Sequence, residues 1–279
     1  MKIPKTMHAV VLDHACDPED LKISEVIVPE TRPGWVLVHV KAFGLNRSEL
    51  MLRAEEVEEP YIASPVILGI ECAGIVVDAS DTRFAVGERV VALMGGMGRS
   101  FNGSYAEYAL LPEKQVFSVD DLVSNSTWAE IAAIPETWFT AWGSLMVNLR
   151  MSAGERLLIR GGTSALGLAA LQIAKGLGCK VAATTRKAKR ASFLQEKGAD
   201  WVLVDNGTLG EQVQSVCPKG FDAILELIGP KTLQESFTFA TRPGRVCMTG
   251  ILSKPYELAC FDPIKDIPNG VCLSGFFSN

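Results

Sequence analysis

A glycine-rich run joins a strand-like apolar segment, 157–159, to a helix-like apolar segment, 168–177, and this junction constrains the fold more than any other feature. Gly162, Ser164 and Gly167 hold the three positions of the G-x-G-x-x-G fingerprint, which allows a tight turn, close approach of a pyrophosphate and packing of helix on strand. Phosphates then lie at the positive N-terminus of the helix. The cofactor-binding residues predicted here are Gly161, Gly162, Thr163, Ser164, Ala165, Leu166 and Gly167.

Ser164 departs from the fingerprint, because its Cβ crowds the approach of the phosphate. Its hydroxyl offers a hydrogen bond to a phosphate oxygen in compensation. The competing interpretation is a glycine-rich turn that binds no ligand, since a single motif match has many false positives.

The next predicted strand is 180–185, and the residues at its end distinguish an NAD site from an NADP(H) site. An NAD site needs a carboxylate about 20 residues beyond the first glycine, to accept from the ribose 2′-hydroxyl. Residues 184–190 contain no Asp or Glu and contain four cations. Such cations suit a 2′-phosphate, so the sequence predicts NADP(H), bound by Thr185, Arg186 and Arg190. The alternative is a solvated basic start to a surface helix.

Composition limits the function classes. The chain has 279 residues, 48% of them hydrophobic, and a formal net charge of -5. It is long and apolar enough for a globular protein of two domains, and its acidity argues against nucleic acid or anionic membrane as a partner. No apolar run reaches about 18 residues and no hydrophobic segment follows the N-terminal charges, so we expect a cytoplasmic protein.

The seven cysteines are scattered and include no C-x-x-C pair. This spacing fits neither a disulfide framework nor a cysteine zinc cluster. We therefore expect buried cysteines and no bound metal.

Two kinds of strand pattern divide the chain. Residues 1–125 contain short strand-like runs with turn signals, such as 35–40 and 74–77, which are typical of a β-rich, barrel-like domain. A helical pattern at 128–149, broken at Pro135, leads into alternating strands and helices in 126–279. This predicts an α/β fold in which a doubly wound parallel (Rossmann) sheet follows the β-rich domain. Its predicted strands are 156–160, 180–185, 201–204, 221–227, 245–249 and 271–277.

Four ordered motifs make the chain resemble the medium-chain dehydrogenase/reductase superfamily, and most closely its zinc-independent quinone oxidoreductase branch. They are the segments 43–50, 68–74 and 132–135 and the glycine-rich run. The resemblance covers essentially the whole chain and implies a GroES-like N-terminal domain. Zinc alcohol dehydrogenases carry a Cys in the first motif and a Gly-His-Glu in the second, whereas this chain has Gly44 to Asn46 and Gly69-Ile70-Glu71.

The resemblance implies transfer of hydride from NADPH to a quinone or an α,β-unsaturated carbonyl, without metal. It places Asn46 as donor to the developing oxyanion and Thr140 against the nicotinamide, and it implies that Gly250 and Phe276 contact the cofactor. The alternatives are a loop-capping Asn46 and a Thr140 bonded back to a helix carbonyl. Glu71 is expected to pair with a cation and not to act as an acid.

The resemblance also implies a homodimer formed through the sixth Rossmann strand. Relatives continue beyond that strand to complete the catalytic domain, whereas this sequence stops at Asn279, so we expect a natural truncation or a fragment. A catalytically weak NADPH-binding or interaction protein is therefore the second function, and alcohol dehydrogenase activity the third.

Overall fold

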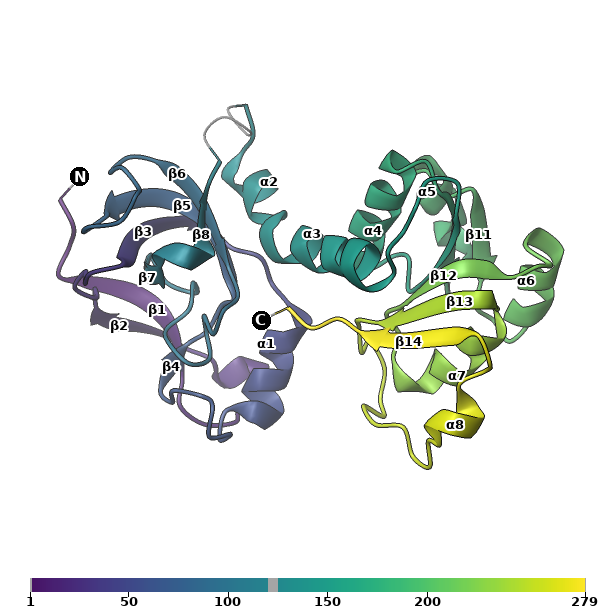
Figure 1. The fold of residues 1–279 in the computed structure, drawn as a ribbon. Coiled ribbons are helices and arrows are strands. Elements are labelled where there is room, and N and C mark those ends of the chain that lie inside the picture. Colours follow the sequence, from purple (N-terminus) through teal and green to yellow (C-terminus); the bar gives the residue numbers. More distant parts are fainter. Residues whose placement is uncertain (1, 120–124, 279) are drawn as a thin grey trace. The chain divides into compact units, whose positions relative to one another are not determined.

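The computed structural model describes residues 2–119 and 125–278, which form two compact units (Figure 1). One unit comprises Met1–Glu136 with Ser278–Asn279, and the other comprises Thr137–Phe277. Among the described residues, no helix is long and apolar enough to cross a membrane.

The N-terminal unit is built on antiparallel sheets. One sheet has three strands in the order β2-β1-β4, and the other has five in the order β7-β3-β5-β6-β8. The strands are β1 Thr6–Leu12, β2 Ile23–Ile27, β3 Trp35–Ala42, β4 Val66–Ile67, β5 Glu71–Asp78, β6 Arg89–Leu93, β7 Tyr108–Pro112 and β8 Val116–Ser118. The helical segments are η1 Pro18–Asp20, α1 Arg47–Met51, η2 Leu52–Glu56, η3 Glu113–Gln115 and α2 Trp128–Ala132.

The core of this unit follows the two-residue period of its strands. Alternate side chains of β3, Val36 and Val38, are fully buried against Val76 of β5 and Leu111 of β7. Ile131 and Ala132 of α2 pack with this unit as well, against Ala73 of β5. The curled antiparallel sheet confirms the β-rich N-terminal domain that the sequence predicts.

The C-terminal unit contains a six-stranded parallel sheet in the order β11-β10-β9-β12-β13-β14. The strand order reverses between β9 and β12, as in doubly wound dinucleotide-binding sheets, so the predicted fold class is confirmed. The strands are β9 Arg156–Arg160, β10 Lys180–Thr185, β11 Trp201–Val204, β12 Phe221–Glu226, β13 Ala240–Met248 and β14 Val271–Gly275. The helical segments are α3 Pro135–Trp142, whose first two residues belong to the N-terminal unit, η4 Gly143–Asn148, α4 Ala165–Gly176, η5 Ala188–Arg190, α5 Ala191–Glu196, α6 Leu209–Val216, α7 Pro230–Thr238 and α8 Pro263–Asp266.

Helices cover both faces of this sheet. In β9, Leu157 and Ile159 belong to the core that includes α4 and α5, whereas Leu158 belongs to the core that includes α6 and α7. Figure 1 shows α4 and α5 on one side of the sheet and α7 on the other. The strands therefore carry continuous apolar runs, because both faces are buried.

Candidate functional site

The glycine-rich run forms the turn between β9 and α4, as predicted. Gly161 has a φ of +88°, which only glycine adopts without strain. Gly162, to which the sequence pattern assigns the tight turn, also leaves no room for a side chain, because an added Cβ would lie 2.8 Å from the Ala183 Cβ of β10. The turn is tied to the end of β10, because Gly161 N donates to Thr184 Oγ1 at 3.0 Å and Gly162 N donates to the Thr184 carbonyl at 3.1 Å.

Gly167 performs the packing role that the fingerprint predicts. A Cβ built on Gly167 would lie 2.6 Å from the Gly161 carbonyl oxygen and 2.9 Å from the Gly162 Cα. Both contacts are with backbone, which has no free end to move aside. A side chain at 167 would therefore separate α4 from the turn.

Ser164 is the N-cap of α4. Its hydroxyl accepts from Gly167 N at 3.0 Å and donates to the Gly161 carbonyl at 2.9 Å. The first-turn N–H groups of Ala165 and Leu166 belong to the set that a helix cannot satisfy internally, and the first turn carries no acidic residue. These amides can therefore receive an anion, as the N-termini of helices commonly do.

The basic segment follows β10 at the same edge of the sheet. Thr185 is buried and its hydroxyl accepts from Lys187 N at 3.2 Å, which fixes the bend after the strand. The four cations of the segment are exposed, and none forms a salt bridge within the described part of the chain: Arg186, Lys187, Lys189 and Arg190. A positive surface therefore stands beside the turn.

The carboxylate at the end of the neighbouring strand is already engaged. Asp205 follows β11, and its Oδ2 accepts from Arg160 Nη2 at 3.0 Å. Arg160 is fully buried and also forms an ion pair with Glu235 at 2.9 Å. Sequence reasoning missed this cluster, because its members lie up to 75 residues apart in the chain.

Gly250 and Phe276 lie at the carboxyl edge of the same sheet, after β13 and β14. Gly250 N donates to the Glu226 carbonyl at 3.3 Å, and Phe276 N donates to the Met248 carbonyl at 3.2 Å. The Phe276 ring packs on Gly143, where an added Cβ would lie 2.1 Å from it. The predicted cofactor-binding residues of this unit thus gather at one edge of one sheet, where doubly wound proteins bind their ligands.

Thr140 is buried on α3. Ser144, one turn later, links the Thr140 carbonyl to Thr249, the residue that follows β13. Ser144 Oγ donates to the Thr140 carbonyl at 2.7 Å and lies 2.8 Å from Thr249 Oγ1. Since the Ser144 proton is used on the carbonyl, the Thr249 hydroxyl donates to Ser144. The sequence did not identify Ser144 or Thr249, because nothing local marks a hydroxyl that meets a partner 105 residues away.

Asn46 belongs to the N-terminal unit, where it is the N-cap of α1 and its backbone N–H donates to Glu49 Oε2 at 2.7 Å. Its side chain does more than cap the helix, because Nδ2 donates to Glu71 Oε1 at 2.8 Å. Glycine at 44 leaves room for this carboxylate, since a Cβ there would lie 2.1 Å from Oε1. Asn46 and Glu49 form a capping box, so the loop-capping alternative holds together with the contact between the Asn46 amide and a buried acid.

Glu71 and Glu49 are two buried carboxyl groups beside Asn46. Glu71 Oε2 accepts from Glu136 N at 2.8 Å, so an amide and a backbone N–H supply the hydrogen bonds of a carboxylate that we expected to pair with a cation. Burial raises the pKa of Glu71 to about 7, although both hydrogen bonds lower it. Burial also raises the pKa of Glu49, against hydrogen bonds from Tyr105, Asn46 N and Ile70 N. Glu71 therefore titrates near neutral pH.

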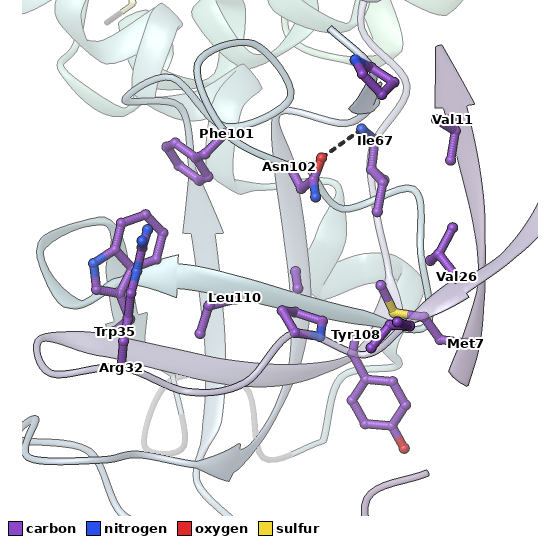
Figure 2. A pocket seen from close by; sticks show the side chains of 15 residues that line it. Met7, Val11, Val26, Arg32, Trp35, Ile67, Phe101, Asn102, Tyr108 and Leu110 are labelled. Atoms are coloured by element: carbon purple, nitrogen blue, oxygen red, sulfur yellow. Dashed lines mark hydrogen bonds between the residues drawn. The ribbon is translucent and has the colours of Figure 1, made fainter. Parts of the chain in front are cut away.

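A separate hollow of about 360 Å³ lies on the N-terminal unit, between β1, β2 and β7 (Figure 2). Its walls are mainly apolar, and Asn102 accepts from Ile67 N at 3.0 Å within it. Its lining includes none of the residues that the sequence singled out. Elsewhere among residues 2–119 and 125–278, no group of three His, Cys, Asp or Glu side chains is arranged to hold a metal ion.

Comparisons with known proteins match both units of the chain to dehydrogenase families. Residues 32–121 match the family model described as alcohol dehydrogenase GroES-like domain, and residues 165–279 match the model described as zinc-binding dehydrogenase. The chain is 30% identical over 254 residues to a quinone oxidoreductase from Lama guanicoe, covering 88% of this chain and 73% of that protein. It is 29% identical over 251 residues to a quinone oxidoreductase from Homo sapiens, covering 88% and 74% respectively.

Among solved structures, an NAD-dependent alcohol dehydrogenase superimposes with a TM-score of 0.85 at 27% identity. The superposition covers 96% of this chain and 84% of that one. The shared architecture thus extends over both units of the chain.

Proposed function

The chain belongs to the medium-chain dehydrogenase/reductase family, as an oxidoreductase of the quinone oxidoreductase type, and from this premise we propose that it reduces a quinone or an α,β-unsaturated carbonyl with NADPH. The observation that carries the proposal is the glycine turn at the N-terminus of α4, next to a carboxylate-free, basic end of β10. The quinone oxidoreductases among its relatives favour this class of acceptor.

The residues present fit a dinucleotide with a 2′-phosphate. Glycine at 161 permits the left-handed turn, and glycine at 167 keeps α4 packed against it, since a Cβ there would lie 2.6 Å from the Gly161 carbonyl oxygen. The N–H groups of Ala165 and Leu166 would receive the pyrophosphate, and Arg186 and Arg190 would pair with the 2′-phosphate. Asp205 is bound to Arg160, which argues against its use as the ribose-binding carboxylate of an NAD site.

When bound, NADPH supplies the hydride, and the protein has to orient the acceptor and stabilise the charge that forms on its oxygen. We assign the second task to the Asn46 amide, since a correctly placed donor contributes about 10²–10³ in turnover. Thr140, buried and held through Ser144, would lie against the nicotinamide. Segments 44–46 and 69–71 lack the Cys and the His with which zinc relatives hold their metal, so we propose that the reaction needs no zinc.

The cofactor assignment is tested by replacing Arg186 and Arg190 together with Ala. We expect NADPH binding to weaken by about 2–4 kcal/mol, or roughly 30-fold or more in Kd, while NADH binding hardly changes. Lys197→Ala is the matched control, since this cation lies after α5 and beyond the basic segment. Equal losses for both cofactors would refute the assignment.

The reaction is tested by steady-state oxidation of NADPH with a panel of quinones and enones. Turnover above the rate of the protein-free mixture, retained after dialysis against a chelator, supports a zinc-independent reductase. Tight NADPH binding without turnover on any acceptor would favour the second candidate, an NADPH-binding or interaction protein. Oxidation of alcohols with NADP and loss of activity on chelation would favour a zinc alcohol dehydrogenase.

We further propose a cytoplasmic homodimer joined through β14. This strand is at the edge of the six-stranded sheet and pairs only with β13 within the described residues, so its outer side offers backbone groups to a second copy. Sedimentation equilibrium at micromolar concentration tests it, and a monomeric mass would refute it.

A further inference from the structure

The hydrogen bonds of Glu71 suit its ionised state. The side chain is 2% exposed, and each of its oxygens faces a donor: Oε1 faces Asn46 Nδ2 and Oε2 faces Glu136 N, both at 2.8 Å. An ionised carboxylate accepts at both oxygens, whereas a protonated one also carries an O–H that needs an acceptor. The two contacts are those that the ionised form accepts.

A proton on Glu71 that lies along one of these two contacts requires that partner to become an acceptor. The backbone N–H of Glu136 cannot reverse its polarity. The Asn46 amide can, because rotation by half a turn about its terminal bond exchanges Nδ2 and Oδ1. Protonation at Oε1 is then satisfied by the Asn46 oxygen, and the amide is inverted.

We propose that Glu71 is a positioning residue whose ionised carboxylate fixes the direction of the Asn46 amide, so that this amide presents an N–H to the substrate oxygen. The inference rests on the donor role assigned to Asn46 in the proposed function. With one Nδ2 proton on Glu71, the second remains for the substrate. Inversion puts the carbonyl oxygen in the place of that nitrogen, so the substrate oxygen meets an acceptor and loses its stabilisation.

The groups around Glu71 bring its protonation into the neutral pH range. Burial is the largest effect and raises the pKa of Glu71 to about 7, while the bonds from Asn46 and Glu136 N oppose it. The carboxylates of Glu136 on α3 and Glu49 on α1 also raise it. Tyr105 and Cys72, whose own pKa values are raised in part by Glu71, complete the ionisable surroundings.

The first test compares the pH dependence of kcat in the wild type and in Glu71→Gln. Wild-type kcat should fall about tenfold between pH 8 and pH 6, as a single group with a pKa of about 7 gains its proton. In Glu71→Gln the new carbonyl accepts from Glu136 N, so the new NH₂ faces Asn46 and holds its amide inverted. The kcat of Glu71→Gln should be about tenfold or more below that of the wild type at pH 8, and it should not change between pH 6 and pH 8.

Two controls separate positioning from general damage. Glu107→Gln removes a half-exposed carboxylate of the same unit and should leave the profile unchanged. The Kd for NADPH should be the same in the wild type and Glu71→Gln, since the carboxylate is assigned no contact with the cofactor. Wild-type kcat or a surviving acid limb in Glu71→Gln would overturn the proposal.

The second test uses the cofactor-free protein and no activity. The ¹⁵N resonance of the Asn46 side-chain amide, assigned by its loss in Asn46→Ala, should shift with a midpoint near pH 7 and stay constant in Glu71→Gln. An amide resonance that does not titrate in the wild type would overturn the coupling between Glu71 and Asn46. The proposed function fails in a different measurement. If Asn46→Ala keeps the wild-type turnover, the donor role of Asn46 is refuted, whether or not the amide resonance titrates.

Discussion

Removing the Ser164 hydroxyl separates two roles for the residue that departs from the dinucleotide fingerprint. In the structure the hydroxyl makes two hydrogen bonds, accepting from Gly167 N at 3.0 Å and donating to the Gly161 carbonyl at 2.9 Å. Both are used within the turn, so the hydroxyl acts as a helix cap. We therefore expect Ser164→Ala to affect folding stability more than cofactor affinity.

The size of the effect follows from capping energetics. Replacing an N-cap serine by alanine costs about 0.5–2 kcal/mol, and replacing it by glycine costs only a few tenths. For a unit of this size a loss of about 1 kcal/mol lowers Tm by about 3 °C. We expect that shift for Ser164→Ala, a smaller one for Ser164→Gly, and an almost unchanged Tm for Ser164→Thr, which keeps the hydroxyl.

The assay pairs thermal unfolding with an NADPH titration on the same preparations. If the hydroxyl is a cap, Tm should follow the order Thr, Gly, Ala at position 164, while Kd for NADPH stays within about threefold of the wild type. A Kd raised tenfold or more in both the Ala and Gly variants, with Tm unchanged, would refute this reasoning. It would show that the hydroxyl holds a phosphate oxygen and that the turn rearranges when the cofactor binds.

Two further predictions concern the turn and the buried acid. Gly167→Val should abolish measurable NADPH binding in a titration, because even its Cβ would lie 2.6 Å from the Gly161 carbonyl; near-wild-type binding would contradict the packing argument. Because the folded pKa of Glu71 is raised from 4.5 to about 7, its proton stabilises the folded state below pH 4.5 and this contribution is lost as the pH rises to 7. The loss is about 3 kcal/mol, so denaturant unfolding between pH 4.5 and pH 7 should show a decrease in stability that is about 3 kcal/mol larger in the wild type than in Glu71→Gln; an equal pH dependence in the two proteins would refute it.

The parallel sheet was predictable because its signals are local. The predicted bounds of the strands 156–160, 180–185 and 201–204 match β9, β10 and β11. Strands buried on both faces are unbroken apolar runs, and the turns between them carry glycine. The phosphate turn and the basic end of β10 follow from the same short-range pattern.

Strand edges that depend on pairing were less predictable. β13 begins at Ala240, five residues before the predicted start at 245, because Ala240 pairs with Phe221 across a register shift. The short strands β4 and β8 were not predicted, since two or three residues carry no periodicity of their own. Their existence is decided by the neighbouring strands β1 and β6.

By itself, then, the sequence determined the two-part architecture, the glycine turn and the cations beside it, because each is encoded within a few consecutive residues. Only the tertiary structure decided that Glu71 meets the Asn46 amide and the Glu136 backbone, which lie 25 and 65 residues away from it in the chain. The ionisation of Glu71 is likewise a tertiary property. A carboxyl group titrates according to its burial and its partners, and neither exists until the chain has folded.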